Sequence, residues 1–337
     1  MRGFLIKLAI GVAGLVILVK YGSIDLGVLM KAADRPGLLA LAFLCMLATV
    51  PIAAWRWWLL LRGLQFTLTL PWSVNVTFIS LFFHTFLPGA HGGDLVRLGL
   101  AYRSAGGGLS RLTFSVLVDR LAGLLSLLIL GLIMVPALPP AYASRIEWVA
   151  AIALAAGVVG LVVALKSGDW LARLLRRLPA PVGPALANVV SELVAALRAY
   201  WTQPGRLTAA LAISLAQYLL VLLALFLLGH AMGFTDLSRA GYVIAGVWST
   251  VANSLPITPG GIGVGEAAFA HVALALTSQP SGSISYGTVF LAMRVLTVII
   301  GIGGVLPWLL NRVDLRHGVA AIKNEPAAER RPLPVAE

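Results

Sequence analysis

The chain has 337 residues, of which 59% are hydrophobic and only 11% are charged, and its mean hydropathy is +0.94. A soluble domain carries about a quarter charged residues, so this composition excludes one, and continuous apolar runs without in–out alternation argue against a β-barrel. The net charge of +12 does not indicate nucleic acid, because basic residues in membrane proteins mark the cytoplasmic side.

Several apolar segments are long enough to cross a bilayer as helices, which takes about 20 residues. In chain order they are residues 4–22, 38–61, 111–135, 147–165, 207–229 and 284–310. We therefore expect an all-α polytopic membrane protein with about six full transmembrane helices, in which residues 1–312 form a single integral membrane domain.

Two further hydrophobic segments are interrupted. They are residues 71–100, broken at LPGAHGGD (87–94), and residues 240–277, broken at LPITPGGIGVGE (255–266). Proline removes a backbone donor and clashes with the preceding turn, so Pro88, Pro256 and Pro259 mark helix breaks. In lipid such a break survives only when it is buried in protein or lines a wet cavity. We expect both segments to be re-entrant helical hairpins.

The distribution of basic residues predicts the topology. With a cytoplasmic N-terminus, and with both hairpins returning to the side that they entered, most Lys and Arg residues fall in cytoplasmic stretches, Arg56 and Arg97 among them. The C-terminus is then cytoplasmic as well. The cluster WRWW (55–58), at the end of a span, is predicted to be an interfacial aromatic anchor.

Two segments lie outside the predicted spans. Residues 167–205 form an amphipathic cytoplasmic connector, in which residues 169–178 suit a helix on anionic lipid, although a connector packed on the protein fits equally well. Residues 313–337 mix both charges with Pro and Ala, which predicts a disordered cytoplasmic tail.

The two broken segments repeat one pattern. LP-x-x-x-GG occurs at 87–93 and again at 255–261, and each occurrence is followed by a span that carries an arginine, Arg120 or Arg294. In the predicted topology the first hairpin enters from the cytoplasm and the second from outside, which makes an inverted repeat. Inverted repeats with discontinuous helices near the midplane are typical of transporters. The repeat halves are about residues 71–135 and 240–310.

Charged residues occur in or beside these apolar segments, and each needs a partner or a wet cavity, because an unpaired charge at mid-bilayer costs at least about 2.5 kcal/mol. They are Asp94, Arg97, Asp119, Arg120, Glu266 and Arg294. Because the acids and bases can cancel, the set favours one shared internal site over isolated pairs. Asp94 can cap the helix that follows and pair with Arg97, and Asp119 can neutralise an arginine of the other half.

The glycine pairs at the breaks suggest what such a site binds. Backbone N–H groups at the positive ends of short helices bind anions. Together with Arg120 and Arg294, the four glycines would suit a phosphate, while Glu266 would gate, accept a proton or bind a cationic part of a headgroup. The glycines are Gly92, Gly93, Gly260 and Gly261.

The sequence lacks complete motifs for nucleotide binding, ester hydrolysis or metal binding. GGIGVGE has Glu266 where a dinucleotide-binding loop has its last glycine, and no G-x-S-x-G accompanies the HGG at 91–93. The five histidines show no metal-ligand spacing. We expect no metal, no cofactor and no catalytic residue.

FLPGAHGGDLVR (86–97), SVLVDRLAGLL (115–125) and SLPITPGGIGVGEAAF (254–269) resemble the lysylphosphatidylglycerol synthase transmembrane-region family, also called flippase-like membrane proteins. The resemblance covers nearly the whole chain. The chain is similar in length to hopanoid-associated members of the family. It implies movement of a lipid, often one with a phosphate headgroup, between leaflets. The synthases continue into a soluble aminoacyl-transferase domain, whereas this chain stops at a short charged tail, so we expect no lysyl transfer.

From these observations we expect a lipid flippase in the bacterial inner membrane, with the headgroup phosphate between the two hairpin tips. Two alternatives stay open: a non-catalytic membrane scaffold for a lipid-biosynthesis complex, and a membrane-embedded headgroup transferase. The expected partner is a membrane lipid, namely a phospholipid, a polyprenyl lipid or a hopanoid. Lipid-biosynthesis enzymes and a second copy of the chain are further candidates, and nucleic acid is not.

Overall fold

The computed structural model describes residues 26–86, 92–137, 201–254, 262–277 and 286–310, together with Thr258 and single positions between 170 and 200. Its elements in chain order are α2 (Leu26–Lys31), η1 (Ala32–Asp34), α3 (Pro36–Gly63), α4 (Leu70–Phe86), α5 (Gly92–Ala105), α6 (Leu109–Met134), η2 (Val135–Ala137), α9 (Pro204–Ala231), α10 (Arg239–Ser254), α11 (Val264–Leu276), α12 (Gly287–Ile302) and α13 (Val305–Leu310). Within these ranges the chain is all-helical, as expected.

Four helical stretches are long and apolar enough to cross a membrane: α3, α6, α9 and the run from Gly287 to Leu309 that joins α12 and α13. They coincide, apart from small shifts at their ends, with four of the predicted spans, which are thereby confirmed as long apolar helices. Several predictions fall outside the described residues: the spans at 4–22 and 147–165, most of the connector, the tail, Pro88, Pro256, Pro259, Gly260 and Gly261.

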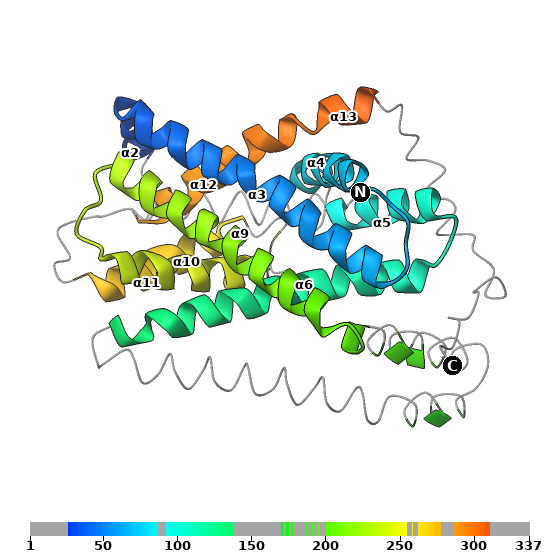
Figure 1. Ribbon diagram of the computed structural model, residues 1–337. Helices are drawn as coiled ribbons and strands as arrows, with labels where there is room; N and C mark the ends of the chain where they lie inside the picture. The colour runs from blue at the N-terminus through cyan, green and yellow to red at the C-terminus, as the bar shows by residue number, and fades with distance from the viewer. Residues whose placement is uncertain are drawn as a thin grey trace.

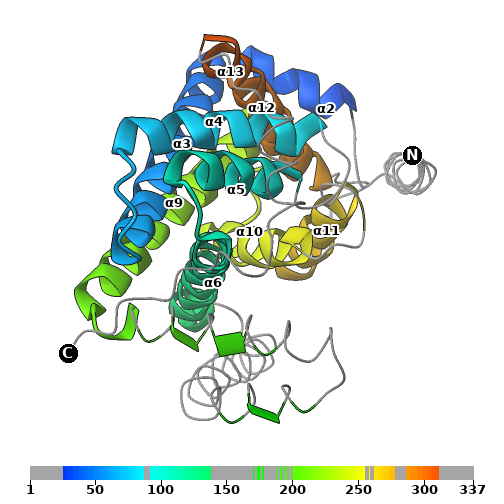
Figure 2. The same cartoon turned by 90° about the vertical axis from the view of Figure 1, so that its right-hand side faces the viewer.

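The longest contact in the bundle is between α3 and α9, which lie side by side over most of their length (Figures 1 and 2). Around this pair, α4 and α6 pack against α3, and α10 and α12 pack against α9. Glycine permits one of the closest approaches. A Cβ on Gly304, between α12 and α13, would stand 2.1 Å from the backbone oxygen of Phe78 on α4. These helices could not meet so closely with a larger residue there.

The first broken segment folds as two packed helices, α4 and α5. Near the break, the Ser80 hydroxyl donates to the Gly93 carbonyl at 2.8 Å, and a Cβ on Gly93 would meet the backbone oxygen of Ser80 at 2.4 Å. At the far end, Trp72 Nε1 donates to Ser104 Oγ at 3.2 Å. The start of α4 therefore lies beside the end of α5, which is the geometry of a helical hairpin.

The second broken segment also folds as two packed helices, α10 and α11. Asp236, just before α10, accepts a hydrogen bond from the hydroxyl of Thr277, which follows α11, at 3.2 Å. The hydroxyl of Tyr286, at the start of α12, donates to the same carboxylate. The start of α10 therefore lies beside the end of α11, and this segment is a helical hairpin as well.

The two hairpins open at opposite ends of the bundle. At one end Arg206 Nη1, near the start of α9, donates to the Arg62 carbonyl, near the end of α3, at 2.7 Å, and the loop after α3 leads directly into α4. At the other end Arg35 Nη1, before α3, donates to the His230 carbonyl near the end of α9, which leads into α10. Figure 1 accordingly has α4 and α5 on the right and α10 and α11 on the left.

The end with Arg62 and Arg206 is strongly basic. It also carries Arg103 and Arg111, and the segments 60–72, 98–114 and 196–210 contain no Asp or Glu. The Tyr200 hydroxyl donates to the Leu60 carbonyl at 2.8 Å, and burial raises the pKa of this phenol above its usual range, so it stays a donor.

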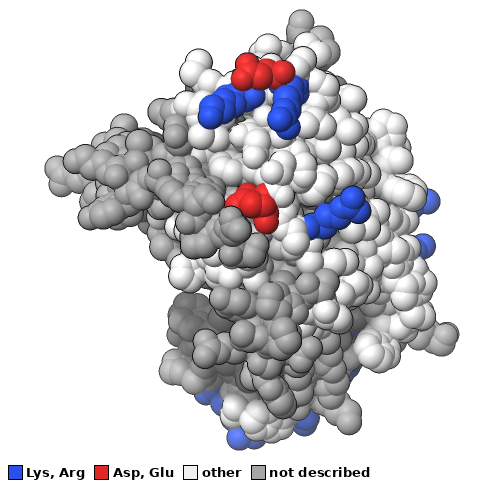
Figure 3. Space-filling model, turned by 90° about the vertical axis from the view of Figure 1, so that its left-hand side faces the viewer, with Lys and Arg blue, Asp and Glu red and all other residues white. Residues whose placement is uncertain are grey.

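At the opposite end, few charged side chains of both signs stand on a largely uncharged surface (Figure 3). The exposed charged residues described there are Lys31, Asp34, Arg35, Asp236 and Arg239. The two ends therefore differ in charge: one is basic, and the other holds acids and bases together.

Candidate functional site

The second hairpin holds a buried ion pair. Glu266, in the first turn of α11, is fully buried, and its Oε1 lies 2.6 Å from Nε of Arg294 on α12. Its Oε2 accepts from the Gly263 N–H at 2.9 Å, which caps the helix, and lies 3.3 Å from Arg294 Nη2. The same Nη2 donates to Asn253 Oδ1 on α10 at 2.9 Å. Arg294 on α12 thus joins both helices of the hairpin, through Asn253 on α10 and Glu266 on α11.

The first hairpin repeats this arrangement at its own break. Asp94, in the first turn of α5, accepts from Nη2 of Arg120 on α6 at 2.6 Å. In both halves, therefore, a carboxylate just after the break pairs with an arginine on the next helix. The surroundings differ, because the Arg120 side chain is 54% exposed and that of Arg294 only 20%.

A second cluster in the first half is almost fully enclosed. Asp119 on α6 accepts from Arg56 Nε of α3 at 2.7 Å and from Arg97 Nη1 of α5 at 3.1 Å. Arg56 also donates through Nη1 to Ser214 Oγ on α9, at 2.9 Å. The cluster therefore ties α3, α5, α6 and α9 together around one carboxylate. With two guanidinium groups for that carboxylate, it carries a formal charge of +1.

Two N–H-bearing nitrogens of Arg97 have no hydrogen-bond partner among the described residues. Its guanidinium carbon lies 3.7 Å from the ring centroid of Trp57, whose Nε1 donates to Ser115 Oγ. Stacking on an aromatic face holds the guanidinium in place while leaving its edge open to hydrogen bonds. Nε and Nη2 of Arg97 are buried with no hydrogen-bond partner among the described residues. The cluster thus holds one excess positive charge and two unused donors.

This pairing corrects three expectations. Arg97 pairs with Asp119, not with Asp94, and Asp119 pairs with Arg97 of its own half and with Arg56 on α3, which precedes that half, not with an arginine of the other half. None of these ion pairs joins the two repeat halves, so the described charges do not form one shared cluster. Spacing on a helix made an Asp94–Arg97 contact possible, but α6 supplies each of them with a closer partner.

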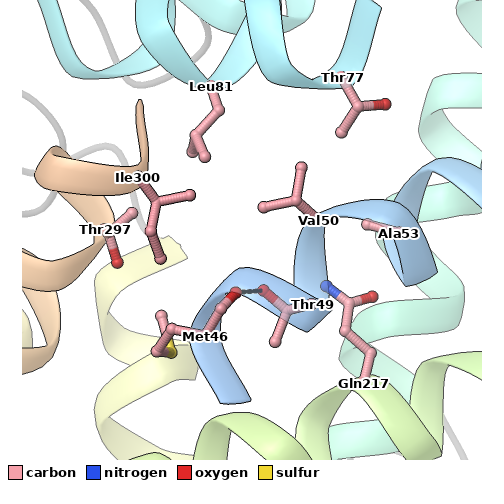
Figure 4. Close-up of a pocket in the computed structure, with 9 residues that line it drawn as sticks. All are labelled: Met46, Thr49, Val50, Ala53, Thr77, Leu81, Gln217, Thr297 and Ile300. Carbon is pink, nitrogen blue, oxygen red and sulfur yellow. Dashed lines mark hydrogen bonds between the residues drawn. The ribbon is translucent and has the colours of Figure 1, made fainter. Parts of the chain in front are cut away.

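A cavity of about 140 Å³ lies where both halves meet (Figure 4). Four helices line it: α3 with Met46, Thr49, Val50 and Ala53, α4 with Thr77 and Leu81, α9 with Gln217, and α12 with Thr297 and Ile300. Most of this lining is apolar, and the polar part consists of three hydroxyls and one amide. The described residues around it carry no charge.

The cavity lies between the charged clusters along the bundle axis. Towards the basic end, Arg56 follows Ala53 by three residues on α3, and Ser214 precedes Gln217 by three on α9, so the Asp119 cluster is one helical turn away. Towards the other end, Arg294 precedes Thr297 by three residues on α12. One neutral chamber is thus flanked by an arginine cluster on either side.

Gly92 and Gly93 begin α5, and both are buried. Gly93 has a packing role that the sequence did not reveal, because any side chain there would collide with α4. The first turn of α5 also contains Asp94, whose negative charge lies at the positive end of the helix.

Sequence reasoning missed Arg56, Ser214, Asn253 and Gln217. Arg56 was assigned to the cytoplasmic surface and WRWW to the interface, but Arg56 is buried in an ion pair and Trp57 is fully buried. The available signal was the arginine itself, since it lies about two turns inside an apolar run and needs an acid. Ser214, Asn253 and Gln217 carry no such signal, because polar uncharged residues are common in membrane helices.

The family model described as lysylphosphatidylglycerol synthase TM region matches residues 4–304. No curated protein and no solved structure matches the chain.

Proposed function

Because this chain belongs to the lysylphosphatidylglycerol synthase transmembrane-region family, a family of multi-pass membrane proteins with a lipid-related role, we propose that it is a lipid transporter. It moves a phosphate-bearing lipid between the leaflets of a bacterial inner membrane. The headgroup travels through the interior of the bundle while its hydrocarbon chains stay in lipid.

One observation carries this proposal: two helical hairpins that open at opposite ends of the bundle, with a chamber between their charged clusters. In a membrane, such hairpins are re-entrant, and together with the spans that follow they form an inverted repeat. Repeats of this kind present one site to both sides in turn, which is the basis of alternating access. The paired acid and arginine after each break agree with a repeat, since they occur in both halves.

The charge balance indicates what the site binds. The Asp119 cluster has an excess charge of +1, and Arg97 keeps two buried donors without partners among the described residues. A phosphodiester carries one negative charge and accepts two parallel hydrogen bonds from an arginine edge. It would satisfy both requirements at once. Arg56 would hold Asp119 in place, and Asp119 would orient Arg97.

The second half has a different role in this proposal. Glu266, Arg294 and Asn253 already satisfy one another, so this cluster needs no ligand to be stable. It would act as the gate on the other side of the chamber. An arriving phosphate would compete with Glu266 for Arg294, and opening the pair would expose the chamber to that side.

The orientation follows from the charged ends. We place the end with Arg62, Arg103, Arg111 and Arg206 in the cytoplasm, because the segments 60–72, 98–114 and 196–210 at this end carry basic residues and no acidic ones, and cytoplasmic loops are enriched in Lys and Arg. The first hairpin then opens to the cytoplasm and the second to the opposite side.

Reconstitution tests the proposal. The purified chain is placed in liposomes that contain phosphatidylglycerol with a fluorophore on one acyl chain, and dithionite bleaches the outer leaflet. Transport makes the label in both leaflets accessible, whereas protein-free liposomes lose only the outer label. Arg97→Met removes the charge and both free donors, and we expect it to abolish transport. Arg111→Met is the matched control at the basic end, outside the clusters.

Three other outcomes would decide against transport. If liposomes that contain folded protein bleach to the same extent as protein-free liposomes, the proposal is overturned. A change in headgroup mass after incubation would identify a transferase. If the liposomes stay inactive while deletion in cells lowers the activity of a lipid-synthesis enzyme, the chain is a scaffold.

A further inference from the structure

The Asp94–Arg120 pair lies at an unusual depth for an exposed charge. Arg120 is about 16 Å along α6 from its first residue, and α6 has 26 residues, so this arginine is far from both ends of a span. Its side chain is nevertheless 54% exposed. A charge at this depth is costly unless it faces the bundle interior, a wet cavity or a place where the bilayer thins around it. What surrounds Arg120 therefore decides what it contacts.

The surface around Arg120 is apolar. On the same face of α6 the side chains of Leu117, Leu121 and Leu124 are exposed, and Leu95, which follows Asp94 on α5, is exposed as well. Exposed leucines on a helix that spans the membrane contact lipid chains. The Asp94–Arg120 pair therefore faces the lipid.

Two neighbouring ion pairs join α5 to α6. In the outer pair Asp94 of α5 meets Arg120 of α6, and in the inner pair Arg97 of α5 meets Asp119 of α6. Asp119 and Arg120 are consecutive, and Asp94 and Arg97 are about one turn apart, so the two pairs are adjacent on both helices. The inner pair is enclosed, and two donors of its Arg97 have no partner among the described residues. Charged groups thus lead from the lipid-facing surface to the buried cluster.

We propose that the surface of α5 and α6 at Arg120 is the lateral entrance of the transporter, where Arg120 takes the phosphate of a membrane lipid and passes it to Arg97. The inference rests on the proposed function and names the place where the substrate enters. An exposed guanidinium within the bilayer draws headgroups and water towards it by local thinning. The phosphate then competes with Asp94 for the same guanidinium edge, while the lipid chains stay against the leucines.

Photolabelling locates the headgroup. The full chain is reconstituted with a phosphatidylethanolamine whose nitrogen is acylated with a diazirine, which leaves the phosphate as the only charge. After irradiation, mass spectrometry maps the labelled residues. We expect several-fold more label at Leu121, beside Arg120, than at Leu219, the matched control near the middle of α9. Their side chains are equally exposed, at 54% and 53%, so equal labelling would overturn the entrance.

Two variants of the outer pair should act in opposite directions. Arg120→Gln should lower the label at Leu121 to the level at Leu219, and slow the transport of labelled phosphatidylglycerol about tenfold, as expected for one lost hydrogen bond to a charged group. Asp94→Asn weakens the competitor of the phosphate, so it should raise the label at Leu121. Arg111→Gln, at the basic end, is the control and should change neither. If the pair only holds α5 against α6, both variants will change the labelling in the same direction.

The entrance and the proposed function can fail separately. Transport by the wild-type chain without excess label at Leu121 would overturn the entrance and leave transport standing. Excess label that disappears in Arg120→Gln, in a chain that moves no lipid, would support a headgroup site at Arg120 and overturn the proposed function.

Discussion

In the first half of the chain Asp94 pairs with Arg120, and in the second half Glu266 pairs with Arg294, each acid lying in the first turn after a helix break. Beyond this shared pair the halves diverge. The second half closes its pair with Asn253 and a backbone N–H, and leaves no net charge. The first half adds Asp119 between two buried arginines, and so holds an excess positive charge.

The difference separates what a repeat must keep from what it can change. The acid–arginine pair fixes the helix after each break to the span that follows, so both halves need it for their shape. Among the described residues, the excess charge occurs in one half only. A buried charge without a partner is costly, so we expect a bound anion to compensate it. We infer that the first half contains the anion site and that the second half contains the gate. The predictions below test this division, beginning with the largest effect.

Asp119→Asn should be the most damaging substitution. It removes the carboxylate between Arg56 and Arg97 and leaves two guanidinium groups buried side by side. Breaking a buried pair by removing one partner costs about 3–5 kcal/mol, and here two arginines lose the same partner. We expect a lower thermal midpoint in detergent and poor yield. A second change, Arg56→Met, should recover part of the loss, and a double variant no more stable than Asp119→Asn would show that the pair is not what stabilises the cluster.

Glu266→Gln should cost less, although Glu266 is fully buried. An amide can still accept from the Gly263 N–H, and Arg294 keeps Asn253 and some exposure to solvent. Since hydrogen bonds to charged groups contribute about 1.5–3 kcal/mol, we expect a loss of that size in the free energy of unfolding. Transport should become less dependent on which side of the membrane the lipid starts from, because the gate no longer closes. A protein as unstable as Asp119→Asn would contradict the ranking of the two halves.

The same contrast explains how much of this protein could be predicted from its sequence. Helices α3, α6, α9 and α12 were predictable because a long apolar run has few alternatives to a helix in a bilayer. The ion pairs were not, because they depend on which faces of distant helices meet. Nothing in the spacing of Arg56 or Ser214 says that α3 lies along α9 with Asp119 between them. Glu266 and Arg294 were named as candidate residues only as members of one shared site, and the structure pairs them with each other.

Arg97→Lys should lower transport about tenfold while changing stability little. Lysine keeps the charge beside Asp119 but loses the planar edge that presents two parallel donors, and it stacks less well on Trp57. A bidentate contact reduced to a single one loses about one hydrogen bond to a charged group. The measurement is the initial bleaching rate with labelled phosphatidylglycerol, next to Arg111→Lys. If Arg97 only fills space among buried waters, the two lysine variants will transport equally well.

Asp94→Asn should have the smallest effect on stability, because the side chain of its partner Arg120 is more than half exposed and a long arginine side chain that loses its partner can extend towards water or headgroups, which an enclosed one cannot. The comparison with Glu266→Gln is the sharpest test of the two halves, since both changes replace the acid that follows a break with its amide. Chemical denaturation of the two variants under the same conditions gives the difference directly. A large loss for Asp94→Asn would mean that Arg120 is enclosed in the membrane after all. The first half would then have a closed gate of its own, and the assignment of the anion site to that half alone would have to be abandoned.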